Sequence, residues 1–222
     1  MTTSAFLSNL GHEMCGPVSF VNGFAGILRD GVLGPLSPDQ IQAVDRIREG
    51  SDRLLHLVDR LISFARIQDG TFKVEPREQN YAPVVEGVVS AFEPFAARKG
   101  VSLGLEPGFS GAGLLDPHAT TLVLCNLVDN AVKFTPAGGR VSVRTRREEG
   151  FILTEVADSG AGIAAGDLGE IRRRLRKGGP GTAGGLGIGI VGPIVAAHGG
   201  EVRVHSVPGE GTTFAFTLPA GR

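Results

Sequence analysis

The sequence predicts an α+β protein in two parts: an N-terminal two-helix hairpin, then an α/β sandwich with helices on one face of a mixed sheet. Apolar residues up to about residue 68 recur at steps of three and four, which is a helical period. Beyond Asp69, short strand-like runs alternate irregularly with helical segments. Glycine gathers between the apolar segments of this second part, which indicates shaped loops. We place the boundary at Gly70 and expect domains 1–69 and 70–222.

Two heptad seams define the hairpin. Between them the segment GVLGPLSPD breaks the helix, and Ser37 or Asp39 can cap the second helix. One hairpin does not bury both seams and the further apolar residues beside them, so we expect a second copy to complete a homodimeric four-helix bundle. The seams are Leu7, Leu10, Met14, Pro17, Val21, Phe24 and Leu28, then Val44, Ile47, Ser51, Leu54, Val58, Leu61 and Ala65.

The second part alternates strands with helices. Several turns are short enough for antiparallel hairpins, which favours a mixed sheet covered by helices on one face. We expect helices near 82–99 and 119–134, and strands at FKVEP (72–76), VSLGL (101–105), RVSVRTR (140–146), FILTEVAD (151–158), GGEVRVHS (199–206) and GTTFAFTLP (211–219).

Composition excludes several classes of function. Lys and Arg number 22 against 23 Asp and Glu, so no global charge favours nucleic acid or an anionic membrane as the partner. Cys15 and Cys125 lie far apart and form neither a zinc motif nor a disulfide framework, which fits a reducing cytoplasm. No apolar run approaches the roughly 20 residues of a membrane span, so we expect any sensor domain or anchor to lie outside this chain.

The first helix carries the motif FLSNLGHEMCGP. Counting from Leu7 as heptad position a puts His12 at position f, away from the bundle core, where a histidine is usually an ordinary surface residue. HExxxP, followed by a turn and a second seam ending in LISFARIQDG, resembles the H-box of the histidine kinase family. The resemblance implies that His12 accepts the γ-phosphoryl group of ATP and that Glu13 takes the proton from the other ring nitrogen. Cys15 and Gly16 depart from the family pattern.

A second motif lies in the segment LVLCNLVDNAVKFTP. Asn126, Asn130 and Lys133 stand at i, i+4 and i+7, on one helical face, which without context is as often a solvated face as a ligand site. The segment resembles the N-box of the same family. The resemblance implies that Asn130 holds Mg²⁺ through its amide oxygen and that Lys133 meets phosphate; oxygen ligation suits this hard cation.

Glycine-rich motifs follow. VADSGAGI resembles the G1 box, which implies that Asp158 accepts the adenine amino group beside Gly160 and Gly162. A Rossmann site is the competing interpretation, but no acid follows about 20 residues on, and no P-loop motif occurs. GTAGGLGIGIVGPIVAAHGG resembles the G2 box, whose residues approach the phosphates, and PGEGTTFAFTLP resembles the last glycine box, near the base. The corresponding residues are Gly185, Leu186 and Gly187, then Thr212 and Thr213.

The segment between Gly162 and Gly185 contains no aromatic residue, whereas the family has its F-box there. It carries a basic run instead, which we expect to be a solvated helix face, since most charge runs are. The run comprises Arg172, Arg173, Arg174, Arg176 and Lys177.

These boxes stand in family order over nearly the whole chain. The resemblance implies a Bergerat (GHKL-type) fold and a two-component sensor histidine kinase core: Mg·ATP phosphorylates His12, and the phosphoryl group passes to an aspartate on a response-regulator receiver domain. A second hypothesis is a degenerate kinase, a dimeric nucleotide-binding module that regulates a partner. A third is an ATPase or serine kinase of the same fold, for which an exposed His12 would have no use.

Overall fold

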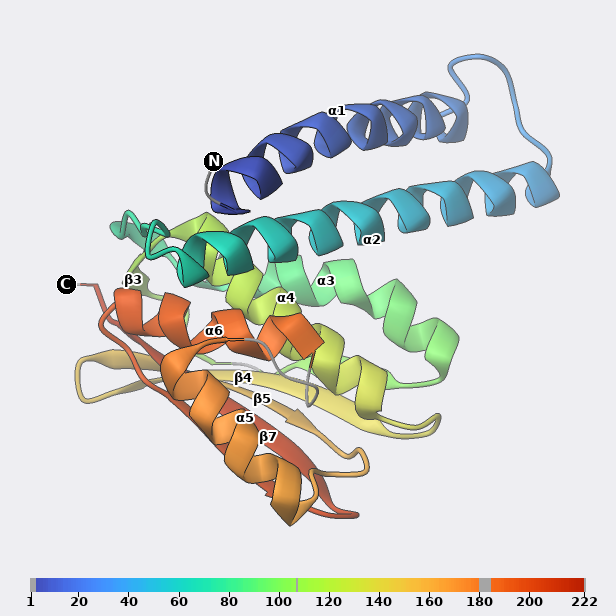
Figure 1. The fold of residues 1–222 in the computed structure, drawn as a ribbon. Coiled ribbons are helices and arrows are strands. Elements are labelled where there is room, and N and C mark those ends of the chain that lie inside the picture. The colour runs from blue at the N-terminus through green and yellow to red at the C-terminus, as the bar shows by residue number, and fades with distance from the viewer. Residues whose placement is uncertain (1–2, 107, 180–184, 222) are drawn as a thin grey trace. The chain divides into compact units, whose positions relative to one another are not determined.

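The computed structural model describes the backbone of residues 3–106, 108–179 and 185–221, and the side chains of residues 13–106, 108–179 and 187–221. The chain divides into two compact units, Met1–Thr71 and Phe72–Arg222. The first contains only helices, and the second contains all the strands (Figure 1).

The first unit is a hairpin of α1 (Thr3–Arg29) and α2 (Pro38–Gln68). α2 begins at Ser37 with a capping box: the Ser37 hydroxyl accepts the amide of Gln40 at 3.3 Å, and the Gln40 side chain accepts the amide of Ser37 at 2.8 Å. Across the hairpin, Arg29 bonds to Asp45 at 2.8 Å. The expected helix, break and second helix are all present.

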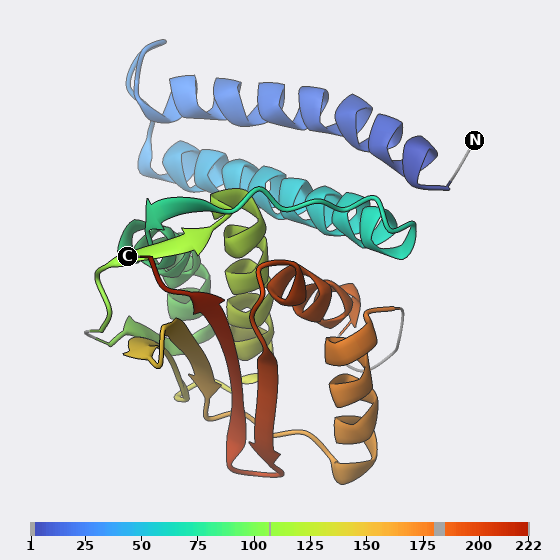
Figure 2. The same ribbon diagram turned by 90° about the vertical axis from the view of Figure 1, so that its left-hand side faces the viewer.

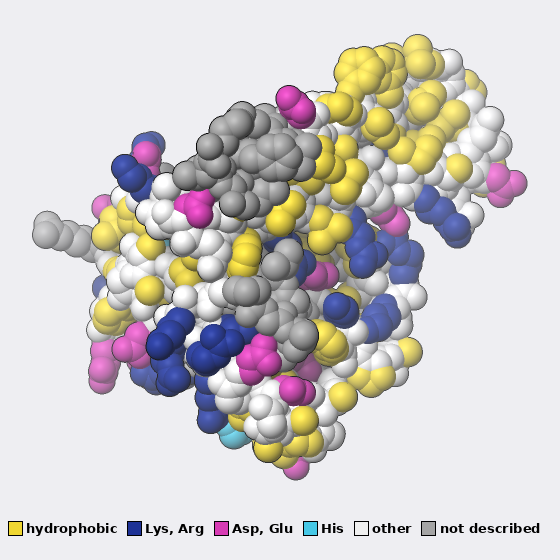
Figure 3. Space-filling view, viewed as in Figure 1, with side chains coloured by type: hydrophobic (Ala, Val, Ile, Leu, Met, Phe, Trp, Pro, Cys, Tyr) yellow, Lys and Arg dark blue, Asp and Glu magenta, His cyan; other side chains and the backbone are white. Residues whose placement is uncertain are grey.

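The hairpin buries only half of the α2 seam. Val44, Ser51, Val58 and Ala65, seven residues apart, are buried. The alternate seam positions remain exposed, and so does an apolar row on α1; apolar side chains gather on this part of the surface in Figure 3. A single hairpin therefore leaves an apolar face for other helices to cover. The exposed residues include Ile47, Leu54 and Leu61 on α2, and Phe20, Val21 and Phe24 on α1.

The second unit is built on a five-stranded sheet in the order β2-β4-β5-β7-β6. β2 pairs with β4 in parallel, and the other pairs are antiparallel, so the sheet is mixed as predicted. The strands are β2 (Ser102–Leu105), β4 (Arg140–Glu148), β5 (Phe151–Asp158), β6 (Val202–Val207) and β7 (Gly211–Pro219).

Three helices lie together over one face of the sheet: α3 (Ala82–Lys99), α4 (Pro117–Phe134) and α6 (Gly185–Ala197) (Figures 1 and 2). The apolar side chains between these layers form the core. Within it, the hydroxyl of buried Tyr81 meets that of Thr154 on β5 at 2.6 Å, so both polar groups are satisfied. No described helix is long and apolar enough to cross a membrane.

The strand expected at 72–76 is wrong. This segment has no regular structure, and the strand β1 begins at Arg77 (Arg77–Asn80). β1 pairs with β3 (Ala112–Leu115), a short strand that the sequence did not predict. The backbone N–H of Glu75 donates to the carboxylate of Asp116, a residue far away in the sequence, at 3.1 Å. This N–H therefore bonds to a side chain and not to a neighbouring strand.

The expectation of a solvated basic face on α5 (Ala165–Lys177) is wrong at one residue. Arg172, Arg173 and Arg176 are exposed, but Arg174 is completely buried where α5 packs against α6. The spacing of residues along a helix shows which of them share a face, but not which face a second helix covers. Here α6 packs against α5 on the side where Arg174 lies.

His198 joins three segments of the second unit. It is 5% exposed; its Nδ1 donates to the Ile194 carbonyl at 2.8 Å, and its Nε2 accepts the backbone N–H of Asp116 at 3.0 Å. This hydrogen-bond pattern fits the tautomer with a proton on Nδ1. Asp116 in turn caps α4 through the amide of Ala119 at 3.1 Å and holds Glu75.

Replacing His198 by alanine should lower the free energy of unfolding of the second unit by about 1–3 kcal/mol, because the buried N–H of Asp116 loses its acceptor. Chemical denaturation followed by circular dichroism measures the change. His205→Ala, at an exposed position of β6, is the matched control and should leave stability nearly unchanged. Equal stability of the two variants would contradict this role of His198.

Candidate nucleotide site

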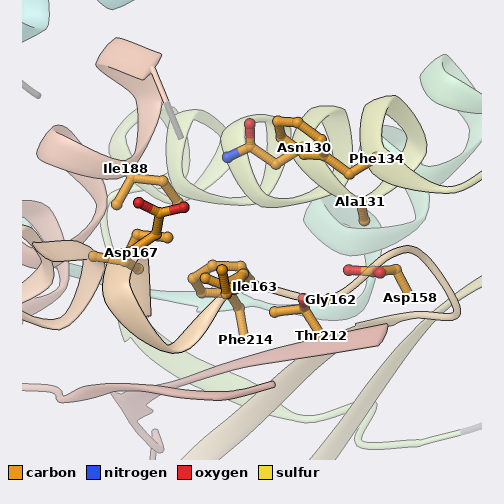
Figure 4. A pocket seen from close by; sticks show the side chains of 12 residues that line it. Asn130, Ala131, Phe134, Asp158, Gly162, Ile163, Asp167, Ile188, Thr212 and Phe214 are labelled. Atoms are coloured by element: carbon orange, nitrogen blue, oxygen red, sulfur yellow. The ribbon is translucent and has the colours of Figure 1, made fainter. Parts of the chain in front are cut away.

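One cavity of about 270 Å³ opens between α4, the β5–α5 loop and the first turns of α5 and α6. Figure 4 shows side chains of α4 along one wall and those of β7 and the loop opposite. Most of the lining is apolar, with a few polar groups, which is the usual chemistry of a small-molecule site. The lining residues are Asn130, Ala131, Phe134, Asp158, Gly162, Ile163, Ala164, Asp167, Ile171, Ile188, Thr212 and Phe214.

Asp158 lies at the end of β5, directly opposite Thr212 in the β5–β7 ladder. Its Oδ1 accepts the backbone N–H of Gly160 at 2.8 Å. Burial raises the pKa of the Asp158 carboxyl, while backbone hydrogen bonds from Gly160 and Thr212 oppose that rise only in part. A partly buried carboxylate with remaining acceptor capacity suits an N–H donor on a ligand.

The loop after β5 can follow its path only with glycine. A Cβ at Gly160 would lie 2.6 Å from the Phe134 carbonyl oxygen. Gly162 has a φ of 68°, and a Cβ there would collide with the Val207 carbonyl oxygen. Both glycines therefore permit a close backbone approach, and this brings the loop up to the end of α4. Gly162 lines the cavity, whereas Gly160 acts through its amide on Asp158.

Asn130 projects from α4 into the cavity and is 7% exposed. Its Nδ2 is buried and has no hydrogen-bond partner among the described residues. A buried amide with an unused group is costly unless a ligand or water completes it. No cluster of three or more His, Cys, Asp or Glu in the described part of the chain suits a metal. An asparagine side chain offers an oxygen that accepts and an NH₂ group that donates, so Asn130 can bind a ligand in either sense.

Other residues from the N-box and glycine motifs lie away from the cavity lining. Asn126 is 1% exposed, and its Nδ2 donates to the Leu122 carbonyl at 2.6 Å. Lys133 is exposed, with its Nζ 5.2 Å from the ring centre of Phe134. Thr213 is half-buried on β7, and Gly187 is buried in α6.

Three predicted residues fall partly outside the described structure. Gly185 and Leu186 form the start of α6, and His12 lies within α1, but the side chains of Leu186 and His12 are outside the described residues. The predicted exposure of the His12 ring thus stays a prediction. Glu13, the next residue, is exposed on α1.

The apolar walls of the cavity were not predicted from the sequence. Phe134, Ile163 and Phe214 supply much of its apolar lining, and Asp167, from the first turn of α5, adds a second carboxylate. Phe134 is 52% exposed and lies near the end of the N-box segment; an exposed aromatic residue within a ligand motif is the signal that could have identified it.

Two protein families match the chain. Residues 2–70 match the "His Kinase A (phospho-acceptor) domain", and residues 115–222 match the "Histidine kinase-, DNA gyrase B-, and HSP90-like ATPase" family. The chain belongs to the histidine kinases. This agrees with the predicted fold and supports ATP as the ligand of the second unit.

The matches to similar proteins cover almost the whole chain. It is 32% identical to the "Histidine protein kinase DivJ" of Caulobacter vibrioides over 96% of its length, and 32% identical to the "Non-motile and phage-resistance protein" of the same organism over 97%. The chain spans 37% and 27% of those proteins. The solved structure of full-length ShkA with AMPPNP is 30% identical, with a TM-score of 0.66, over 99% of this chain and 46% of ShkA.

Asp158→Asn should weaken ADP binding by about ten- to a hundredfold, because a charged acceptor is lost, yet leave the free protein at least as stable at pH 7. A carboxyl whose folded pKa is raised opposes folding once pH rises through that pKa, and asparagine removes this effect. Calorimetric titration measures the ADP affinity, and thermal unfolding at several pH values measures the stability. Lower stability with unchanged affinity would assign Asp158 a purely structural role.

Asn130→Ala should abolish the Mg²⁺-dependent part of ATP affinity and leave the oligomeric state unchanged, because the cavity loses its buried amide but the hairpin is untouched. ATP titrations with Mg²⁺ and with a chelator measure the Mg²⁺-dependent affinity, and sedimentation measures the oligomeric state. Asn126→Ala provides the comparison: its side chain does not line the cavity and its Nδ2 donates to the Leu122 carbonyl within α4, so we expect lost stability rather than lost affinity. Unchanged Mg²⁺ dependence in Asn130→Ala would contradict the metal assignment.

Proposed function

We propose that this chain is the catalytic core of a two-component sensor histidine kinase, which phosphorylates His12 with Mg·ATP and passes the phosphoryl group to a response-regulator aspartate. The main support for this proposal is that one chain contains both a hairpin of the phosphoacceptor family and a cavity lined by Asn130, Asp158 and Thr212. The solved relative named with AMPPNP supports an adenine nucleotide as the ligand.

The adenine ring fits the end of the cavity formed by Asp158. The carboxylate accepts a hydrogen bond from the exocyclic amino group, while Ile163 and Phe214 provide apolar contact with the ring. Thr212 is 7% exposed and its hydroxyl is held 3.0 Å from that of Ser206, so this wall is fixed before the base arrives. Preorganised contacts lower the entropic cost of binding.

The phosphates then extend toward Asn130 and the start of α6. The Asn130 amide supplies an oxygen for Mg²⁺, and the first residues of α6, Gly185 to Gly187, offer backbone amides at a helix N-terminus, which favours anions. Mg²⁺, when bound, neutralises charge on the phosphates. Phosphoryl transfer needs mainly positioning and charge stabilisation from the protein, and these groups supply both.

His12 and Glu13 are the proposed acceptor pair. A neutral imidazole offers an unprotonated nitrogen near pH 7, and a carboxylate that accepts the opposite N–H stabilises the cation formed on attack. Glu13 is exposed and on the same helix as His12, as this role needs. The attacking nitrogen forms a bond to the γ-phosphorus as the bond to the ADP oxygen breaks.

A second copy of the hairpin is the proposed partner of the exposed apolar face. Ile47, Leu54 and Leu61 follow the seam at 36–49% exposure, although such side chains are normally buried in a bundle. The phosphoacceptor family supports dimerisation. Cys15 and Cys125 form no disulfide, which fits the cytoplasm, where we propose that the chain and its receiver-domain partner meet.

Incubation with ATP labelled in its γ-phosphate should leave acid-labile, base-stable label on the protein, and His12→Ala should abolish it without loss of nucleotide affinity. His56→Ala makes the same change in the other helix of the hairpin and should retain the label.

Persistent label in His12→Ala would contradict the acceptor assignment. Nucleotide binding by the wild-type protein without any label would instead favour the degenerate, regulatory kinase. Absence of both binding and label would overturn the nucleotide site as well.

A further inference from the structure

Arg174 is the largest fully buried side chain among the residues that the structure describes, and the only buried Lys, Arg, Asp or Glu there. Arginine is almost never fully buried unless its charge is paired and its N–H groups are bonded. Burial lowers the pKa of the guanidinium, and the charge of Glu170, one turn earlier on α5, opposes this. A buried cation in this position therefore needs a structural or functional reason.

Arg174 joins the end of α5 to the backbone beyond it. Its Nε donates to the Gly179 carbonyl at 3.2 Å, and its own carbonyl accepts the amide of Gly178 at 2.8 Å. The guanidinium thus fixes the direction in which the chain leaves α5. Gly178 and Gly179 both have positive φ, 68° and 104°. Because glycine adopts many backbone conformations, these two residues do not fix the path of the chain by themselves.

The facing side of α6 consists of glycine. Gly192 lies so close to the Leu175 carbonyl of α5 that any side chain would collide with it. A Cβ at Gly189 would lie 2.5 Å from the Gly179 carbonyl and 3.3 Å from an Nη of Arg174. These two glycines let α5 and α6 approach until the Arg174 head group is enclosed between them.

The same two helices form one wall of the nucleotide cavity. Ile171, one turn before Arg174 on α5, and Ile188, next to Gly189 on α6, both line it. Any change in the spacing of α5 and α6 therefore moves this wall. The chain has no aromatic residue between Gly162 and Gly185 to fill the space between these elements.

We propose that Arg174 is a positioning residue for nucleotide binding: it holds α5 against the glycine face of α6 and so sets the distance between Ile171 and Ile188. It acts through these neighbours and not by touching the nucleotide, since it does not line the cavity. This inference rests on the proposed function, because it concerns the same nucleotide site.

The test compares Arg174→Met, which keeps most of the volume but removes the charge and donors, with Arg173→Met on the exposed side of α5. For Arg174→Met we expect the KM for ATP and the dissociation constant of ADP to rise about tenfold, with kcat at saturating ATP within about threefold of wild type. Arg173→Met should match wild type. A merely destabilised protein would lose active molecules and hence kcat, with KM unchanged.

A second variant covers the case in which Arg174→Met does not fold. Arg174→Ala leaves a space of guanidinium size, so millimolar guanidinium should restore much of its ADP affinity, whereas urea at the same concentration should not. Gly189→Ala pushes the helices apart at the same contact. It should weaken ADP binding, and its effect should not add to that of Arg174→Met.

Three results would overturn the inference: a folded Arg174→Met protein that binds ADP as the wild type does, equal rescue by urea and guanidinium, or full additivity with Gly189→Ala. Wild-type protein that fails to bind ADP would instead refute the proposed function. The two failures are thus distinguished by the behaviour of the unmodified chain.

Discussion

The antiparallel pairing of β5 with β7 is the constraint on which the nucleotide site depends. Its register sets Asp158 opposite Thr212 at the end of the sheet, under the C-terminal half of α4. Residues 54 positions apart in sequence thereby become neighbours, and the loop after Asp158 passes close to the end of α4 at Gly160 and close to Val207 at Gly162. A shift of one residue in this ladder would turn the Thr212 side chain to the opposite face of the sheet. The sheet thus holds the polar floor of the cavity in place without any ligand.

Much of this architecture could be predicted from the sequence because it follows local rules. The apolar period predicted the hairpin, and turn chemistry predicted Ser37 or Asp39 as the cap of α2, of which the structure uses Ser37. The runs at 151–158 and 211–219 are central strands. Asp158, Gly162, Asn130 and Thr212 were predicted from the resemblance of their motifs to those of the histidine kinases, and the structure brings these four together. In each case the information lies within a few neighbouring residues.

The features that were missed depend on contacts between distant segments. β1 and β3 are four residues each and exist because they pair with one another, which no local pattern specifies. The burial of Arg174 follows from the approach of α6, made possible by Gly189 and Gly192, and one helix seen alone suggests only a charged face. The separation of Asn126 from Asn130 is similar: two residues on one helical stripe differ because the side chain of Asn126 bonds back to Leu122 and that of Asn130 meets the cavity.

Because half of the α2 seam is exposed in a single hairpin, the stability of the hairpin should depend on the protein concentration. In one hairpin, Val44, Ser51 and Val58 are covered, and Ile47, Leu54 and Leu61 still face water. In the proposed dimer a second hairpin buries this row, so its contribution to stability follows mass action. Dilution removes that contribution, whereas the α/β unit has its core within a single chain. The two halves should therefore differ in how their melting depends on concentration, and a cell that makes few copies would hold more of the hairpin in a loosened form.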